Sequence, residues 1–311
     1  MFLKAHKRLT MGVGLFLLCM VIGLILGVVT AGRDPDPIER DGLPAIDIGK
    51  RWPGNLEACV TANEDIENPE LPNCYREPVD PEDIVKQPWS TWSSLAFCVV
   101  GLFILFKRDR DYEAGATPRM GENLTVYGVV ALLMGPGAMA FHGTLTTWGG
   151  NIDQSSMYPL LASIIALDVS QLHRASSERV LWSFPLWFSA LFGLSVVAIW
   201  ASGGSTLVFM LAAVGTGLWT LASRMFVQGR KGLVRNWWLY GLSLVALGSA
   251  IVPWYVSNPA QGNPTDEFPY HALWHLLSAV FVLCYWWYLR SEREVAPTTA
   301  VFPPESVVSP I

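Results

Sequence analysis

Eight long apolar runs constrain the fold of this chain more than any other feature. Each run is close to the length of about 20 residues that an α-helix needs to cross a bilayer. The runs cover residues 11–31, 89–106, 123–141, 154–172, 180–200, 205–223, 236–256 and 270–289. The chain is 51% hydrophobic and only 15% charged, which is too apolar for an ordinary soluble domain. Because lipid offers no hydrogen-bond partner for the backbone, the runs predict an all-α, polytopic membrane protein.

The distribution of Lys and Arg predicts how the runs are oriented. Basic residues precede the first run and follow the second, fourth, sixth and eighth runs. The connections 142–153, 201–204 and 257–269 contain neither Lys nor Arg. Basic loops are retained on the cytoplasmic side of a membrane. We therefore expect a multi-pass protein of the plasma (inner) membrane with both termini in the cytoplasm. The basic loops follow this alternation and form no aromatic-interleaved patch, so nucleic acid is not an expected partner.

The first apolar run follows a basic N-terminus and is either a signal peptide or an uncleaved anchor, and its length favours the anchor. In both cases it exports an acidic, Pro-rich segment with no helical or strand periodicity. Cys59 and Cys74 lie in that segment and predict a disulfide, with two unpaired thiols as the alternative. The expected domains are the signal anchor or signal peptide 1–32, the acidic extracytoplasmic segment 33–88, a seven-helix membrane domain 89–290 and a cytoplasmic tail 291–311.

Ionisable residues at the ends of apolar runs are functional candidates, because charge is costly in a membrane. Of the five histidines, His142 closes the third run, while His271 and His275 open the eighth. Asp153 comes just before the fourth run. The predicted topology brings all four residues to the extracytoplasmic end of the bundle, near the outer membrane face.

His271 and His275 are spaced i, i+4, so both imidazoles lie on one face of a helix. This is a common spacing for zinc ligands. With His142 the pair supplies three neutral nitrogen ligands, the usual protein complement of a catalytic zinc. The alternatives are haem bound by His271 and His275, or three buried histidines bonded to one another and to Asp153. The second alternative is a costly polar cluster without evident purpose.

These residues carry a resemblance to a known family. The motif F-H-G-T-L, the aspartate eleven residues after its histidine, and H-A-L-W-H at the start of the last helix resemble the alkaline ceramidases. They also resemble the wider superfamily that includes the progestin and adipoQ receptors and GPI-anchor-remodelling proteins. The stretch QPWSTWSSLAF, residues 87–97, is similar to the first core helix of the ceramidases. The resemblance covers roughly Cys74 to Arg290.

The resemblance implies a seven-helix membrane hydrolase that cleaves the amide bond of ceramide or a related N-acyl lipid inside the bilayer. His142, His271 and His275 would bind Zn²⁺, and Asp153 would hold or deprotonate the zinc-bound water. The family places a serine one turn before the first histidine, but this chain has Ala138. Loss of such a donor lowers a rate about a hundredfold or more. A non-catalytic, receptor-like or lipid-binding protein with structural zinc is therefore the alternative, unless Ser155, Ser156, Tyr158 or Ser278 supplies the hydroxyl.

Calcium is a second cofactor that the resemblance raises. Animal alkaline ceramidases bind it through acidic residues just before the first core helix, whereas this chain has Gln87 at one such position, and Tyr75 and Arg76 at others. The nearby acids Glu77, Asp80, Glu82 and Asp83 either form a different calcium site or, as we favour, are a solvated acidic loop.

Overall fold

The computed structural model describes residues 77, 85, 87–115, 123–144, 147–174, 183–202, 233–257 and 268–294, together with 215, 216, 218, 219 and 222. The predicted N-terminal anchor, the predicted disulfide between Cys59 and Cys74, and most of the sixth apolar run, 205–223, lie outside these residues. Asp80, Glu82 and Asp83 also lie outside them.

Seven helices and one pair of very short strands have both ends within the described residues, and residues 215, 216, 218, 219 and 222 are also helical. The helices are α4 (Pro88–Ser93), α5 (Leu95–Glu113), α6 (Asn123–Thr144), α7 (Thr147–Arg174), α8 (Ser183–Ser202), α10 (Trp237–Ser257) and α11 (Tyr270–Arg290). The strands β1 (Leu233–Val234) and β2 (Arg293–Glu294) pair antiparallel and join the start of α10 to the end of α11.

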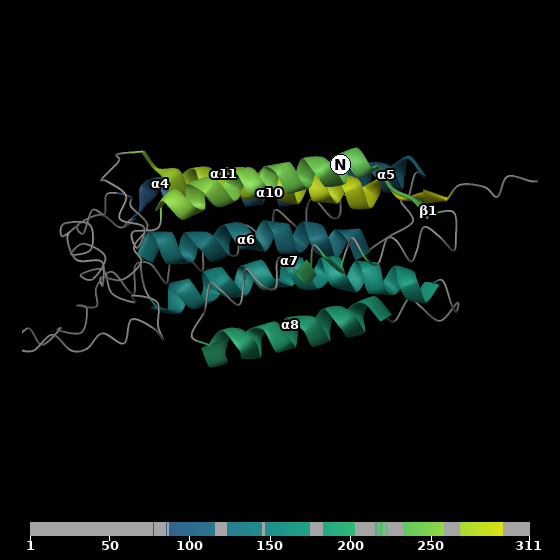
Figure 1. The fold of residues 1–311 in the computed structure, drawn as a ribbon, viewed down its shortest axis with the longest axis horizontal. Coiled ribbons are helices and arrows are strands. Elements are labelled where there is room, and N and C mark those ends of the chain that lie inside the picture. Colours follow the sequence, from purple (N-terminus) through teal and green to yellow (C-terminus); the bar gives the residue numbers. More distant parts are fainter. Residues whose placement is uncertain are drawn as a thin grey trace, which may run out of the picture.

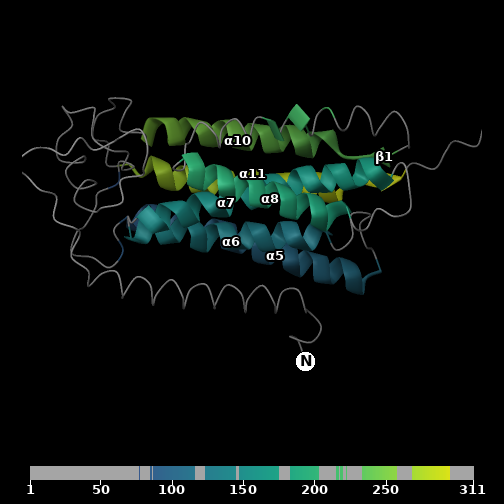
Figure 2. The ribbon, with the colours of Figure 1, turned by 90° about the horizontal axis from the view of Figure 1, so that it is seen from below.

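The long helices run along the long axis of the molecule (Figures 1 and 2). From α5 to α8 each helix packs against the next, and α11 packs against α10, α5 and α6. The short helix α4 contacts α6 and α11. It lies at one end of the bundle, and β1 lies at the other end (Figure 1).

Four described segments are long and apolar enough to cross a membrane: Pro88–Glu113, which joins α4 and α5, and the helices α6, α10 and α11. They confirm the predicted helical class and its compatibility with a membrane. The fourth predicted run, now α7, is not among the four. It carries polar residues at 154–156 and Asp168 within its apolar stretch. The count of seven membrane-crossing helices stays a prediction.

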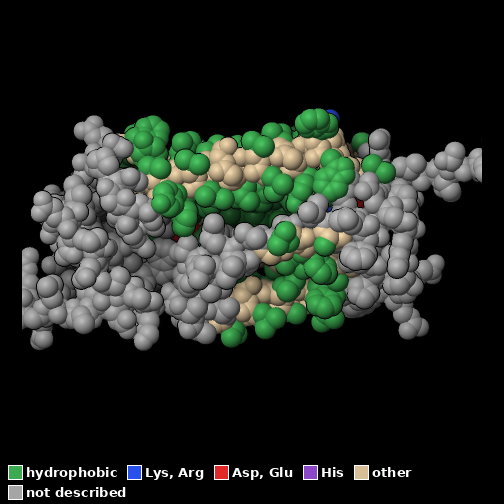
Figure 3. Space-filling view, in the orientation of Figure 1, with side chains coloured by type: hydrophobic (Ala, Val, Ile, Leu, Met, Phe, Trp, Pro, Cys, Tyr) green, Lys and Arg blue, Asp and Glu red, His purple; other side chains and the backbone are tan. Residues whose placement is uncertain are grey.

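The polarity of α4 is inverted relative to that of a surface helix in a soluble protein. On α4, Trp89 and Trp92 are 64% and 53% exposed, whereas Ser90 and Thr91 are buried. Hydrophobic side chains are spread over the described surface in the face shown in Figure 3, where few charged side chains are visible. Polar groups inside and aromatic groups outside are the arrangement expected when lipid, not water, surrounds the helices, with tryptophans near the interface.

Glycines allow the helices next to the histidines to approach closely. A Cβ added at Gly101 of α5 would lie 2.5 Å from the backbone nitrogen of Leu132 on α6. A Cβ added at Gly137 of α6 would collide with the side chain of Ser156 on α7. Small residues at such crossings are typical of helix packing in membranes.

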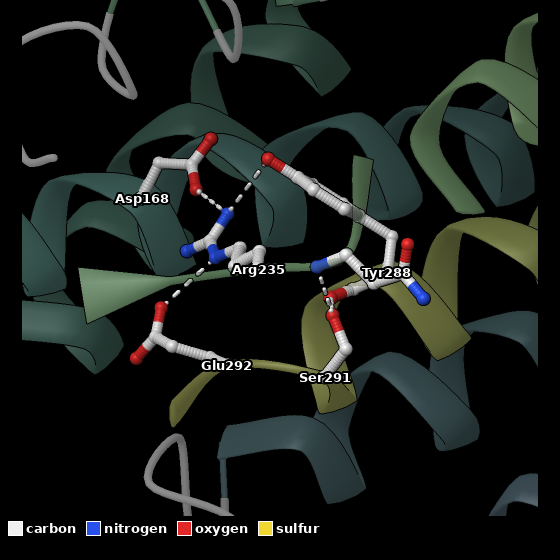
Figure 4. A network of polar contacts seen from close by, with 6 residues as sticks. Asp168, Arg235, Tyr288, Ser291 and Glu292 are labelled. Carbon is white, nitrogen blue, oxygen red and sulfur yellow. Dashed lines mark hydrogen bonds and ion pairs between the residues drawn. The ribbon is translucent and has the colours of Figure 1, made fainter. Parts of the chain in front are cut away.

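A buried ionic network closes the β1 end of the bundle (Figure 4). Arg235, just after β1, donates from Nη1 to Asp168 Oδ1 of α7 at 3.1 Å and from Nε to Glu292 Oε2 at 2.9 Å. The Asp168 and Glu292 side chains are each 2% exposed. The guanidinium also lies over the Tyr288 ring, 5.2 Å from its centroid. This network ties α7 to the ends of α10 and α11.

Candidate metal centre

Three histidines from two helices meet at the α4 end of the bundle. His142 lies two residues before the end of α6, and His271 and His275 occupy the first two turns of α11. Their ring centroids are 4.7 to 5.0 Å apart, and each residue is at most 5% exposed. One ligand nitrogen from each ring lies within 4.8 Å of the others. No other group of three potential metal ligands occurs among the described residues.

The Nδ1 atom of His275 is directed at the short helix α4. It lies 3.0 Å from the Ser90 carbonyl oxygen, 2.9 Å from Ser93 Oγ and 3.2 Å from Ser94 Oγ. Both serine hydroxyls donate to the same Ser90 carbonyl, so their oxygens are left to accept. Because a carbonyl can only accept a hydrogen bond, the proton of His275 resides on Nδ1.

His142 and Gln87 form a two-point contact. The Gln87 backbone N–H donates to the His142 carbonyl at 3.0 Å, and the His142 Nδ1 proton is accepted by Gln87 Oε1 at 2.7 Å. Both residues are fully buried. Gln87 immediately precedes α4, so this helix orients His142 as well as His275.

His271 follows the same pattern with a partner from α10. Its Nδ1 lies 3.4 Å from Ser257 Oγ, whose own proton goes to the Trp254 carbonyl at 2.8 Å. Every one of the three rings thus carries its proton on Nδ1, facing an acceptor. The lone pair of each ring is then on Nε2, a nitrogen that can bind a metal, and such outer contacts commonly orient metal-binding histidines.

The spacing of the three rings fits zinc. Two nitrogens bound to one tetrahedral zinc at about 2.0–2.1 Å lie about 3.3 Å from each other. From a separation of at most 4.8 Å, each ring needs to move inward by less than about 1 Å, which small side-chain rotations supply. Three neutral imidazoles also match the ligand preference of this ion.

Asp153 does not belong to the group of three. Helix α7 begins at Thr147, earlier than the apolar run predicts, so Asp153 lies in its second turn and is half-buried. Helices α6 and α7 are antiparallel neighbours that cross closely at Gly137 and Ser156. From this crossing His142 lies about 7.5 Å and Asp153 about 4.5 Å along the helix axes toward the same end. Asp153 therefore lies at nearly the same depth in the bundle as His142, on an adjacent helix.

The hydroxyl groups near the three histidines differ in the hydrogen bonds that they make. Ala138 is buried one turn before His142, so α6 offers no hydroxyl there. Ser156 donates to the Asp153 carbonyl at 2.6 Å. Ser278 lies three residues after His275 on the same face of α11, and it is 7% exposed. Its Oγ has no hydrogen-bond partner within the described part of the chain.

The interpretation of the acidic residues as a solvated loop is wrong for Glu77. This residue is 1% exposed, and its carboxylate accepts hydrogen bonds from the backbone N–H groups of Trp89, through Oε1, and Ser90, through Oε2 at 2.9 Å. Burial raises the pKa of the Glu77 carboxyl above its ordinary value, and these backbone hydrogen bonds oppose the rise. The described residues form no cation site around Glu77.

Neither the comparison with protein-family models nor the comparison with curated proteins found a match for this chain. Function must therefore be inferred from the side chains at this site and from their surroundings.

Proposed function

We propose that the protein is a zinc-dependent membrane hydrolase that cleaves the amide bond of a lipid, either ceramide or a related N-acyl lipid. The observation that carries this proposal is the convergence of His142, His271 and His275 with every Nδ1 held by an acceptor. Its position at the end of an apolar bundle supports a lipid substrate, whose acyl chain would lie among the helices while its polar group reaches the histidines.

The residues of the chain have separate tasks in this reaction. The histidines would hold zinc, which when bound would lower the pKa of a water toward about 7 and polarise a carbonyl. Asp153 accepts a proton from the attacking water and returns it to the leaving amine. The water oxygen bonds to the carbonyl carbon, the C–N bond breaks, and a fatty acid and a free amine leave. The Ser278 hydroxyl donates a hydrogen bond to the carbonyl oxygen as negative charge develops there.

Metal analysis and a lipid screen test this proposal. The purified protein should contain one zinc per chain and should release fatty acid from a set of N-acyl lipids in detergent. His275→Ala should lose both zinc and hydrolysis. His173→Ala, a histidine at the far end of α7, is the matched control and should keep both. Hydrolysis that persists in His275→Ala would refute the proposed function.

Ala138 favours a second candidate, a receptor-like or lipid-binding protein in which zinc is structural. In that case zinc stabilises the fold and no N-acyl lipid is turned over. Asp153→Asn separates the two candidates, because loss of hydrolysis with retention of zinc excludes the non-catalytic alternative. Ala138→Ser should increase the rate of hydrolysis if the absent hydroxyl limits it, and should change nothing in a protein without activity.

A further inference from the structure

The short helix α4 supplies acceptors to two of the three histidines. Gln87, at its N-cap, accepts the proton of His142, and the carbonyl of Ser90 faces Nδ1 of His275. The orientation of both imidazoles therefore depends on where the first turn of α4 lies. Helix α4 continues through Ser94 into α5, so its C-terminal end is supported by that helix. Its first turn has no such support, and contacts from elsewhere in the chain must satisfy its backbone N–H groups.

The first turn of a helix has backbone N–H groups without partners inside the helix, and in α4 each of them is accounted for. The N–H of Gln87 donates to the His142 carbonyl. Pro88 has no N–H group. The N–H groups of Trp89 and Ser90 both donate to the Glu77 carboxylate.

Glu77 acts here in place of the usual capping side chain. An N-cap residue ordinarily satisfies the second or third N–H of its own helix. Gln87 makes no such bond, because its amide oxygen is bonded to His142. Glu77 lies 12 and 13 residues before its two donors, and its negative charge is favourable at the positive end of a helix.

We propose that Glu77 is a positioning residue of the metal centre, whose carboxylate caps α4 and so holds the acceptors of His142 and His275 in place. This inference rests on the proposed function, since it assumes that the three histidines bind zinc. It also assigns a role to the acidic extracytoplasmic segment, whose last residues become part of the support of the site.

The test is the affinity of the full-length protein in detergent for Zn²⁺, measured by competition with a zinc chelator. Glu77→Ala should bind Zn²⁺ about tenfold more weakly than the wild type, the lower end of the loss seen when outer partners of metal ligands are removed. Glu77→Gln keeps one acceptor oxygen and should show a smaller loss. Asp111→Asn is the matched control. Asp111 is a buried carboxylate that accepts two hydrogen bonds from Arg290 at the opposite end of the bundle. Removing its charge should lower the free energy of unfolding without weakening Zn²⁺ binding.

A double-mutant cycle separates positioning from general destabilisation. If Glu77 acts through α4, Glu77→Ala and Gln87→Ala disturb the same contact. The double variant should then lose less Zn²⁺ affinity than the product of the two fold-losses measured for the single variants. Losses that multiply, or a Glu77→Ala variant that binds Zn²⁺ like the wild type, would overturn the inference while leaving the proposed function intact. A wild-type protein that binds no Zn²⁺ would overturn both.

Discussion

Replacing Gln87 should change zinc affinity in opposite directions according to the side chain introduced. Gln87 accepts the Nδ1 proton of His142 at 2.7 Å in a fully buried position. Gln87→Ala leaves that N–H without its acceptor and no longer fixes the proton on Nδ1. His142 can then carry its proton on Nε2, the atom that must be free to bind the metal.

The size of the effect follows from the contact that is lost. An unpaired buried donor costs about 1–3 kcal/mol of stability. Loss of an outer partner weakens metal binding by about 10–100-fold, or about 1.4–2.8 kcal/mol. Gln87→Glu keeps an acceptor and makes it charged, which strengthens the hydrogen bond and the basicity of the ring. We expect this variant to bind zinc more tightly than the wild type, although its metal-free form is less stable because it buries a carboxylate.

Chelator competition in detergent measures both changes, and the rise in unfolding temperature with added zinc checks them independently. Gln154→Ala is the matched control, because it truncates a second buried glutamine, which lies on α7 and not beside the first turn of α4. Wild-type affinity in Gln87→Ala, or weaker binding in Gln87→Glu than in Gln87→Ala, would refute the tautomer reasoning.

Three further predictions concern catalysis, the ionic network and helix packing. Ser278→Ala should lower the rate of hydrolysis by about a hundredfold with Zn²⁺ affinity unchanged, and a rate equal to that of the wild type would remove Ser278 from the reaction. Asp168→Asn leaves Arg235 with one carboxylate fewer and should lower the free energy of unfolding by about 3 kcal/mol, measured by denaturation, without altering zinc content. Gly137→Val introduces a Cβ that collides with Ser156. This variant should reduce hydrolysis more than zinc binding, because the collision displaces α7, which carries Asp153, and not α11. Equal losses of hydrolysis and zinc binding would contradict this prediction.

The helices were predictable from sequence because one physical constraint dominates them. The run 236–256 differs from α10 (Trp237–Ser257) by one residue at each end, and the run 270–289 differs from α11 (Tyr270–Arg290) by one residue at its C-terminal end. A backbone buried in lipid must form long apolar helices, and such helices can be recognised from the length and composition of the apolar runs alone. The alternation of basic loops then predicts which helix ends share a side, which is how His142 was assigned to the same end as His271 and His275.

The outer contacts of the site were not predictable in the same way. Glu77 lies in a Pro-rich segment without periodicity, and no local signal predicts that its carboxylate returns to cap a helix 12 residues later. In the sequence, Gln87 is notable only because it stands where the ceramidases have an acidic residue. Its position before a proline in the first turn of a helix is, however, typical of an N-cap. The ion pair of Asp168 and Arg235 could have been predicted. An aspartate inside an apolar run is expected to pair with a basic residue, and Arg235 directly precedes the run 236–256.

The inverted polarity of α4 relates the candidate metal centre to the proposed lipid surroundings. Its buried side carries Ser90 and Thr91, and its outer side carries Trp89 and Trp92. In water the exposed tryptophans would favour burial, whereas at a lipid interface they favour the observed orientation. The same rotation of the helix that exposes the tryptophans turns the Ser90 carbonyl toward His275. In the proposed zinc centre, the membrane interface and the Glu77 cap would act together on this one helix, and the affinity for zinc would depend on both.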